Sequence, residues 1–153
     1  MKQKKWICIL LLVLNLAFIW CNSLLPREVS SAFSRLVGAI LSLFTSGEGE
    51  LVEGQGQGVL RKIAHFAEFF TLGILLYWLA NLLHWQNIKK YCLPVALGVA
   101  VACIDETIQV FVPGRGPGLR DVGIDSLGVL LGILSLMVIY AIPRHKNKKS
   151  IQE

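Results

Sequence analysis

Charged side chains are scarce in this chain. Asp, Glu, Lys and Arg make up 16% of its residues, whereas soluble domains usually carry about 25%. Hydrophobic residues make up 54%, and the mean hydropathy is +0.60. The 153 residues are enough for one domain. This composition argues against a soluble protein and favours one that folds in lipid.

Motifs for disulfides and metals are also missing. The cysteines are Cys8, Cys21, Cys92 and Cys103, and no two of them form a Cys-x-x-Cys pair. Neither a zinc site nor a disulfide framework is therefore indicated. A metal site from His65, Glu68 and later acids is a minor alternative, because their spacing matches no standard ligand motif. The sequence predicts no metal and no cofactor.

A nucleic-acid-binding face is not indicated either, although the net charge is +5. The lysines lie in three short clusters that flank apolar runs: Lys2, Lys4 and Lys5; Lys89 and Lys90; Lys146, Lys148 and Lys149. Such placement is typical of a membrane topology signal and not of a basic DNA-binding face. The apolar run that begins at Trp6 lacks a small-residue cleavage pattern, so we expect an uncleaved anchor.

Four apolar stretches are long enough to cross a hydrocarbon core of about 30 Å. They cover residues 6–25, 63–83, 91–112 and 122–142. Backbone groups in lipid must be hydrogen-bonded internally, which predicts helices. We therefore expect an all-α membrane protein, a single domain over 1–153 built on a bundle of four transmembrane helices. More Lys and Arg flank the spans on the side of the two termini, which predicts cytoplasmic N- and C-termini and a basic cytoplasmic tail at 143–153.

The segment between the first two spans has a different pattern. Apolar residues recur at steps of three and four over residues 29–44, with serine, threonine and arginine on the other face. This predicts an amphipathic helix that lies on the outer leaflet or packs over the bundle, with a re-entrant segment as the alternative. Residues 46–58 are rich in glycine and glutamate, which predicts a flexible linker.

Ionisable residues gather at the predicted outer ends of the second, third and fourth spans. Inserting a charged side chain at the centre of a membrane costs about 2.5–3.5 kcal/mol of free energy. A cluster of such side chains therefore requires either ion pairing or a water-filled cavity. We expect a polar cavity open to the outer leaflet, and a salt-bridged cap is the alternative. The candidate ligand-binding residues are Arg61, Lys62, His65, Glu68, Asp105, Glu106, Gln109, Arg115, Arg120, Asp121 and Asp125.

Helical spacing assigns some of these residues to faces. Arg61, His65 and Glu68 share one face. Asp105 and Glu106 point about 100° apart on a helix of 3.6 residues per turn, so one of them is expected to pack against another helix. No serine or cysteine nucleophile has a neighbouring base, so no catalytic residue can be assigned. The candidates for a catalytic role are His65, Glu68, Asp105 and Glu106.

Two further patterns concern helix contact and phosphate binding. Asp121, Asp125, Gly128 and Gly132 form a stripe whose glycines allow close helix contact, which would draw Asp125 into the bundle. Arginines in the Gly/Pro loop, Arg115 and Arg120, have the charge and fork geometry to bind phosphate, although a solvated topology loop would look the same. His65 has a reference pKa suited to acid–base chemistry, yet it fits equally well as a partner for Glu68.

Two segments resemble the signatures of the VanZ-like family. They are 61–70, RKIAHFAEFF, followed by Leu72 and Gly73, and 105–115, DETIQVFVPGR, followed by Asp121, Asp125, Gly128 and Gly132. Ser23 and Pro26 also fit the way that the first span ends in this family. The resemblance implies a bacterial cytoplasmic-membrane protein. It also implies a role in the cell envelope, since the namesake is an accessory determinant of glycopeptide resistance, to teicoplanin more than to vancomycin.

These observations lead to one expected function and two alternatives. We expect the outer polar site to bind an anionic membrane lipid or a lipid-linked peptidoglycan precursor. The first alternative is a membrane hydrolase or transferase acting on a lipid-phosphate substrate. The second is a non-catalytic scaffold, with cell-wall proteins as partners, whose charges only hold the bundle together. No nucleic-acid partner is expected.

Overall fold

The computed structural model describes residues 2–26, 55–115 and 118–142. These residues form four helices, α1 (Lys2–Leu24), α3 (Gln55–Leu82), α4 (Lys89–Val110) and α5 (Leu119–Ala141). Each helix is long and apolar enough to cross a membrane. The predicted all-α architecture with four transmembrane helices is confirmed. The predicted amphipathic helix at 29–44 and basic tail at 143–153 lie outside the described residues.

The helix α3 begins earlier than the sequence predicts. It starts at Gln55, within the range 46–58 that the glycine content assigned to a flexible linker. Glycine lowers helix stability by only about 1 kcal/mol per residue, and adding a turn to an existing helix avoids the cost of a new nucleus. The following span therefore extends back through Gly56 and Gly58.

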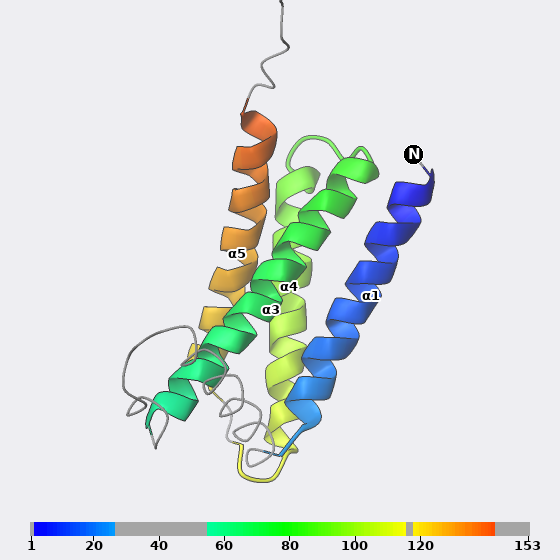
Figure 1. Cartoon of the computed structure of the whole chain (residues 1–153). Coiled ribbons are helices and arrows are strands. Elements are labelled where there is room, and N and C mark those ends of the chain that lie inside the picture. The colour runs from blue at the N-terminus through cyan, green and yellow to red at the C-terminus, as the bar shows by residue number, and fades with distance from the viewer. Residues whose placement is uncertain (1, 27–54, 116–117, 143–153) are drawn as a thin grey trace, which may run out of the picture.

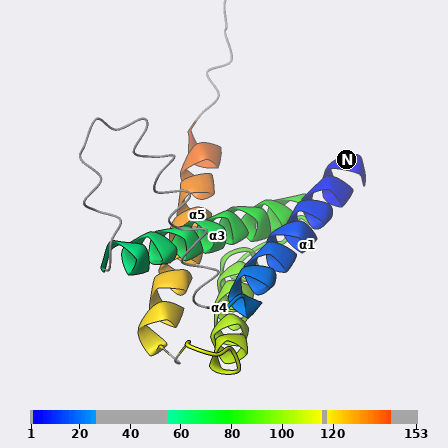
Figure 2. The ribbon, with the colours of Figure 1, turned by 60° about the horizontal axis from the view of Figure 1, so that its bottom comes forward.

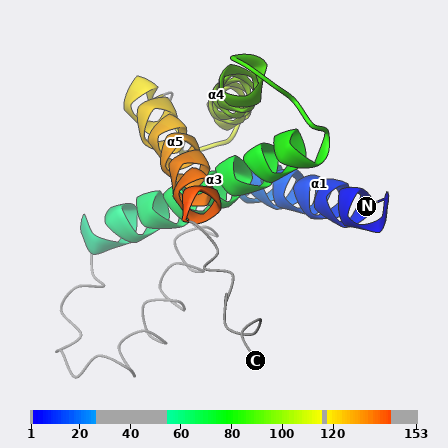
Figure 3. The ribbon, with the colours of Figure 1, turned by 90° about the horizontal axis from the view of Figure 1, so that it is seen from above.

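Neighbouring helices along the chain run in opposite directions. The helices α1 and α4 end where α3 and α5 begin, and the N-terminus lies at the opposite end of the bundle (Figure 1). The helix α3 contacts all three others, and α5 crosses it (Figures 2 and 3). We call the end that holds the start of α3 and α5 the polar end.

Glycines bring α3 and α5 into backbone contact. A Cβ atom on Gly132 would collide with the Phe70 carbonyl oxygen of α3, and one on Gly128 would lie 2.8 Å from the Phe66 carbonyl oxygen. The close contact predicted for these glycines is confirmed. Gly73 provides the reciprocal contact, since a Cβ atom there would collide with the backbone of α5. Without a hydrophobic driving force in lipid, such close packing is what holds membrane helices together.

The remaining surface divides into a packed interior and an apolar exterior. The core gathers around α3 and contains Leu12, Ile19, Phe69, Leu72, Leu75, Leu76, Tyr77, Ala102, Val129 and Ile133. Large apolar side chains also remain exposed along all four helices, above all on α1. In water such a surface would be an aggregation hazard. Around a membrane bundle it is the surface that faces the lipid.

Candidate functional site

The buried polar side chains of the described residues gather at the polar end. They come from all four helices: Ser23 from α1, His65 and Glu68 from α3, Asp105 and Glu106 from α4, and Asp125 from α5. The glycine seam explains the position of Asp125, because it lies one turn before Gly128 on the α5 face that contacts α3. Segments distant in sequence thus bring titratable groups to one depth of the bundle.

Asp105 is the best-connected of these residues. It is fully buried. Its Oδ1 accepts a hydrogen bond of 2.6 Å from the Ser23 hydroxyl, and its Oδ2 accepts one of 2.8 Å from the Gln109 amide. Gln109 also donates to the Ser23 hydroxyl oxygen at 3.3 Å. The three side chains therefore join α4 to the end of α1 and fix the orientation of the carboxylate.

His65 and Glu68 form a second group on α3. The His65 Nδ1 lies 3.5 Å from the Glu68 Oε2, and the other oxygen of Glu68 accepts a 2.7 Å hydrogen bond from the Asn22 amide. Both His65 nitrogens are buried without a hydrogen-bond partner among the described residues. Buried polar atoms are rarely left in this state, so the imidazole is available to a ligand.

Glu106 points away from this group. Its Oε1 accepts a hydrogen bond from the backbone N–H of Gly118, the residue that precedes α5. Glu106 thus ties the end of α4 to the start of α5, while its neighbour Asp105 faces α1. Asp105 thus contacts α1 and Glu106 contacts the start of α5, as the angle of about 100° between adjacent residues on a helix predicts.

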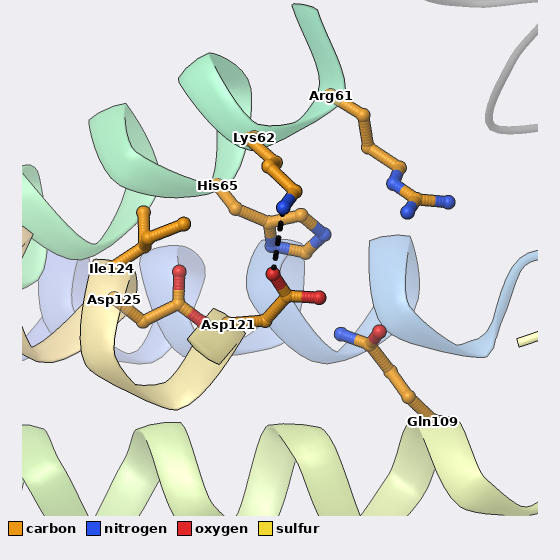
Figure 4. A pocket seen from close by; sticks show the side chains of 7 residues that line it. All are labelled: Arg61, Lys62, His65, Gln109, Asp121, Ile124 and Asp125. Carbon is orange, nitrogen blue, oxygen red and sulfur yellow. Dashed lines mark ion pairs between the residues drawn. The ribbon is translucent and has the colours of Figure 1, made fainter. Parts of the chain in front are cut away.

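A small pocket opens between α3 and α5 at the polar end. Its lining residues are Arg61, Lys62, His65, Gln109, Asp121, Ile124 and Asp125 (Figure 4). The pocket encloses about 10 Å³, which is roughly the room that one water molecule needs. The Lys62 Nζ lies 3.3 Å from the Asp121 Oδ1, and this ion pair crosses the pocket mouth from α3 to α5.

Arg115 lies beside this group in the loop after α4. Its Nη2 donates a 3.1 Å hydrogen bond to the Asn22 carbonyl oxygen at the end of α1. Its Nε and Nη1 are enclosed, and neither has a hydrogen-bond partner in the described parts of the chain. Burial lowers the pKa of the Arg115 guanidinium below its ordinary value, and the nearby Arg61 charge adds to this effect. Arginine remains charged nonetheless.

Arg120, in contrast, does not join the site. It is exposed in the first turn of α5 and does not line the pocket. Its loop neighbour Arg115 turns inward because it bonds the end of α1. The two arginines predicted as a phosphate-binding pair are therefore in different environments.

Neutral donors, not cations, hold most of the buried carboxylates. In the described ranges the ion pairs are Lys62–Asp121 and His65–Glu68. The buried acids Glu68, Asp105 and Glu106 instead accept from an asparagine, a serine, a glutamine and a backbone N–H. The polar end is thus an acidic interior with Arg61, Lys62 and Arg115 around it.

Asn22 and Ser23 belong to the site although the sequence did not single them out as site residues. They end α1, an otherwise almost purely apolar span, and they bond Glu68 and Asp105. A signal was present, because two consecutive polar residues lie at the depth where the other spans carry their charges. The partners could not be predicted, since each hydrogen bond crosses between helices.

Replacing Ser23 with alanine tests how strongly this network holds α1. We expect the folded bundle to lose about 1–3 kcal/mol, because a hydrogen bond to a buried carboxylate disappears. Ser135→Ala is the matched control, since its hydroxyl bonds only the Gly132 carbonyl of its own helix. Thermal unfolding in one detergent, followed by circular dichroism, gives the comparison. Equal midpoints for the two variants would show that the Ser23 contact contributes little.

Comparison with known proteins agrees with the geometry of four spans and a polar end. Residues 7–140 match the family model described as VanZ/LLP1. Searches of curated proteins and of solved structures found no match. The matched region contains all of α3 and α4, α1 from residue 7, α5 up to residue 140, and every buried polar residue of the polar end. Since the match covers most of its length, the chain belongs to the VanZ/LLP1 family of multi-pass membrane proteins.

Proposed function

We propose that the polar end binds the phosphate group of an anionic lipid or of a lipid-linked cell-wall precursor. The observation that carries this proposal is Arg115. Its guanidinium keeps Nε and Nη1 without partners among the described residues, and phosphate oxygens are acceptors that such charged donors bind strongly. A charged group with unused donors in an enclosed site favours an anionic ligand.

Two other cations support the same ligand. Arg61 and Lys62 line the pocket mouth at the start of the α3 span. Arg61 forms no ion pair with the described residues, whereas Lys62 already pairs with Asp121. An entering phosphate would thus meet Arg61 first, and it would compete with Asp121 for Lys62.

The surroundings favour an amphiphile over a soluble phosphate. Large apolar side chains stand exposed at the polar end: Phe111, after α4, is 82% exposed, and Leu119, at the start of α5, is 93% exposed. Ile63, next to Lys62, is exposed as well. A phosphate headgroup at the pocket mouth would leave its prenyl or acyl chain against these residues and the lipid-facing helix surfaces.

The placement of this site at the outer leaflet is part of the proposal. The lysines at the start of α1 and of α4 lie at the opposite end of the bundle (Figure 1). Clusters of lysine favour the cytoplasmic side of a membrane protein. Cytoplasmic termini would therefore leave the polar end facing outward, where lipid-linked precursors of the cell wall are used.

Binding of farnesyl phosphate to the purified protein in a neutral detergent tests this function. We expect saturable binding, with farnesol at least tenfold weaker because it lacks the charge. Arg115→Gln should weaken farnesyl phosphate binding by about 10-fold or more, since a charge-assisted hydrogen bond contributes roughly 1.5–3 kcal/mol. Lys90→Gln is the control, because it removes a cation at the opposite end.

The outcomes separate the three functions. Equal affinities for farnesol and farnesyl phosphate, or an Arg115→Gln variant that binds like the wild type, would contradict phosphate recognition. Release of inorganic phosphate from farnesyl diphosphate, lost in His65→Gln, would make the site that of a hydrolase. Absence of any binding by a well-folded protein would favour the scaffold alternative.

A further inference from the structure

We propose that His65, Asp105 and Asp125 hold a divalent cation such as Mn²⁺ or Zn²⁺. Each residue offers one ligand atom, and these three atoms all lie within 4.8 Å of one another. Donors that share one tetrahedral ion at about 2.0–2.2 Å lie about 3.3–3.6 Å from one another. The three donors would therefore have to close by up to about 1.5 Å to complete the set.

The state of His65 points to a ligand. The residue is only 8% exposed, and neither ring nitrogen has a hydrogen-bond partner in the described ranges. Its ring lies at the pocket beside Asp125 (Figure 4). A histidine used only for packing would normally satisfy at least one nitrogen. Coordination of a cation gives a buried nitrogen the partner that the protein itself does not provide.

The charge around the three donors has the sign that a cation requires. Glu68, Asp105, Glu106 and Asp125 are buried at the polar end, and none of them pairs with a lysine or arginine among the described residues. Uncompensated buried charge is costly in a membrane protein. A divalent ion between Asp105 and Asp125 would offset the charge of both carboxylates at once.

The supporting contacts are those typical of a metal site. Metal-bound histidines usually have a carboxylate at the other ring nitrogen, and bound carboxylates are themselves hydrogen-bonded. Here the Glu68 carboxylate lies 3.5 Å from the His65 Nδ1. Asp105 is oriented by Ser23 and Gln109. The adjoining pocket of about 10 Å³ suits one small ion or a water bound to it.

The donor set favours one class of ion. One imidazole nitrogen with two carboxylate oxygens suits Zn²⁺ and Mn²⁺. Ca²⁺ and Mg²⁺ prefer sites made of oxygen alone. The three donors come from α3, α4 and α5, so no spacing along the chain resembles a metal motif, which is why the sequence predicts none.

The experiment is a titration of the full-length protein with Mn²⁺ in neutral detergent after treatment with EDTA. Free Mn²⁺ is followed by electron paramagnetic resonance. We expect one Mn²⁺ per chain, displaced by Zn²⁺ and poorly by Mg²⁺. Asp125→Asn and His65→Gln should each weaken binding by at least about 10-fold, as loss of even a supporting contact does.

The matched control is His84→Asn. His84 is exposed in the turn between α3 and α4, and its φ of 58° is one that asparagine tolerates. This variant should bind Mn²⁺ like the wild type. Wild-type protein that takes up no Mn²⁺ or Zn²⁺ would overturn the proposal, whatever the variants do. Uptake that persists unchanged in Asp125→Asn would overturn it too, because the ion would then be adventitious.

The ion site goes beyond the proposed lipid function and is tested without any lipid. A failed Mn²⁺ titration leaves the farnesyl phosphate result standing, since that assay depends on Arg115. A failed lipid assay likewise leaves a saturable Mn²⁺ site intact. Binding of farnesyl phosphate that rises with Mn²⁺ would show that the two ligands share the polar end.

Discussion

Replacing Gly132 with valine is expected to abolish the folded bundle. A side chain at this position would collide with the Phe70 carbonyl oxygen, and the Ile74 amide nitrogen lies 3.1 Å from the first added carbon. Both are backbone atoms of α3, so no rotation of a side chain can relieve the contact. Overpacking usually lowers the free energy of unfolding by about 1–3 kcal/mol. A clash that forces two helix backbones apart should lower it by an amount at or above the top of that range. In lipid this packing has no hydrophobic substitute.

Gly123→Val provides the control for this substitution. Gly123 lies on the same helix, and, apart from its own turn of helix, no atom of the described residues lies within 4 Å of the place where its side chain would begin. Membrane abundance and a monodisperse peak in size-exclusion chromatography are the readouts. We expect Gly123→Val to resemble the wild type and Gly132→Val to be degraded or aggregated. A monodisperse Gly132→Val protein would contradict the close contact of α3 and α5.

A strain that lacks its own copy should regain protection against teicoplanin when it expresses this chain, and Arg115→Gln should remove that protection. The expectation follows from the proposed role in the cell envelope and from the guanidinium donors that have no partner among the described residues. Arg115 lies in a loop and not in the packed core, so its loss should affect ligand binding more than folding. The readout is the inhibitory concentration of teicoplanin, with vancomycin in parallel.

Matched membrane abundance and the Lys90→Gln variant are the controls for this comparison. Lys90 lies at the opposite end of the bundle, so its removal should leave protection unchanged. Protection by Arg115→Gln equal to that of the wild type would separate resistance from the polar end. Protection by neither protein would show that the resistance of the namesake does not extend to this chain.

The four spans could be predicted from the sequence to within a few residues, with one exception. Length and hydropathy decide whether a helix crosses a membrane, and both are properties of the local sequence. The exception is the start of α3 at Gln55, where glycine suggested a linker. There the outcome depends on extension from the following span, which local composition does not show.

The sequence was enough to predict at which end of the bundle the candidate site lies, but not which of its side chains contact one another. The order of the spans was enough to bring His65, Asp105 and Asp125 to one end, and the structure places them there. The rotation of each helix decides which side chains then meet. Arg120 faces outward for this reason, and Ser23 faces Asp105. Those angles result from the packing of complete helices, above all at the glycines of α5.

The division of the polar contacts among all four helices has a consequence for biogenesis. Glu68 meets its Asn22 donor, and Asp105 its Ser23 donor, only when α1 has docked, because both donors come from the last turn of that helix. During biogenesis, a chain whose first span has not docked leaves the Glu68 carboxylate without its asparagine donor beside the lipid, which is costly. The polar contacts therefore penalise any arrangement in which the first span stays apart from the other three.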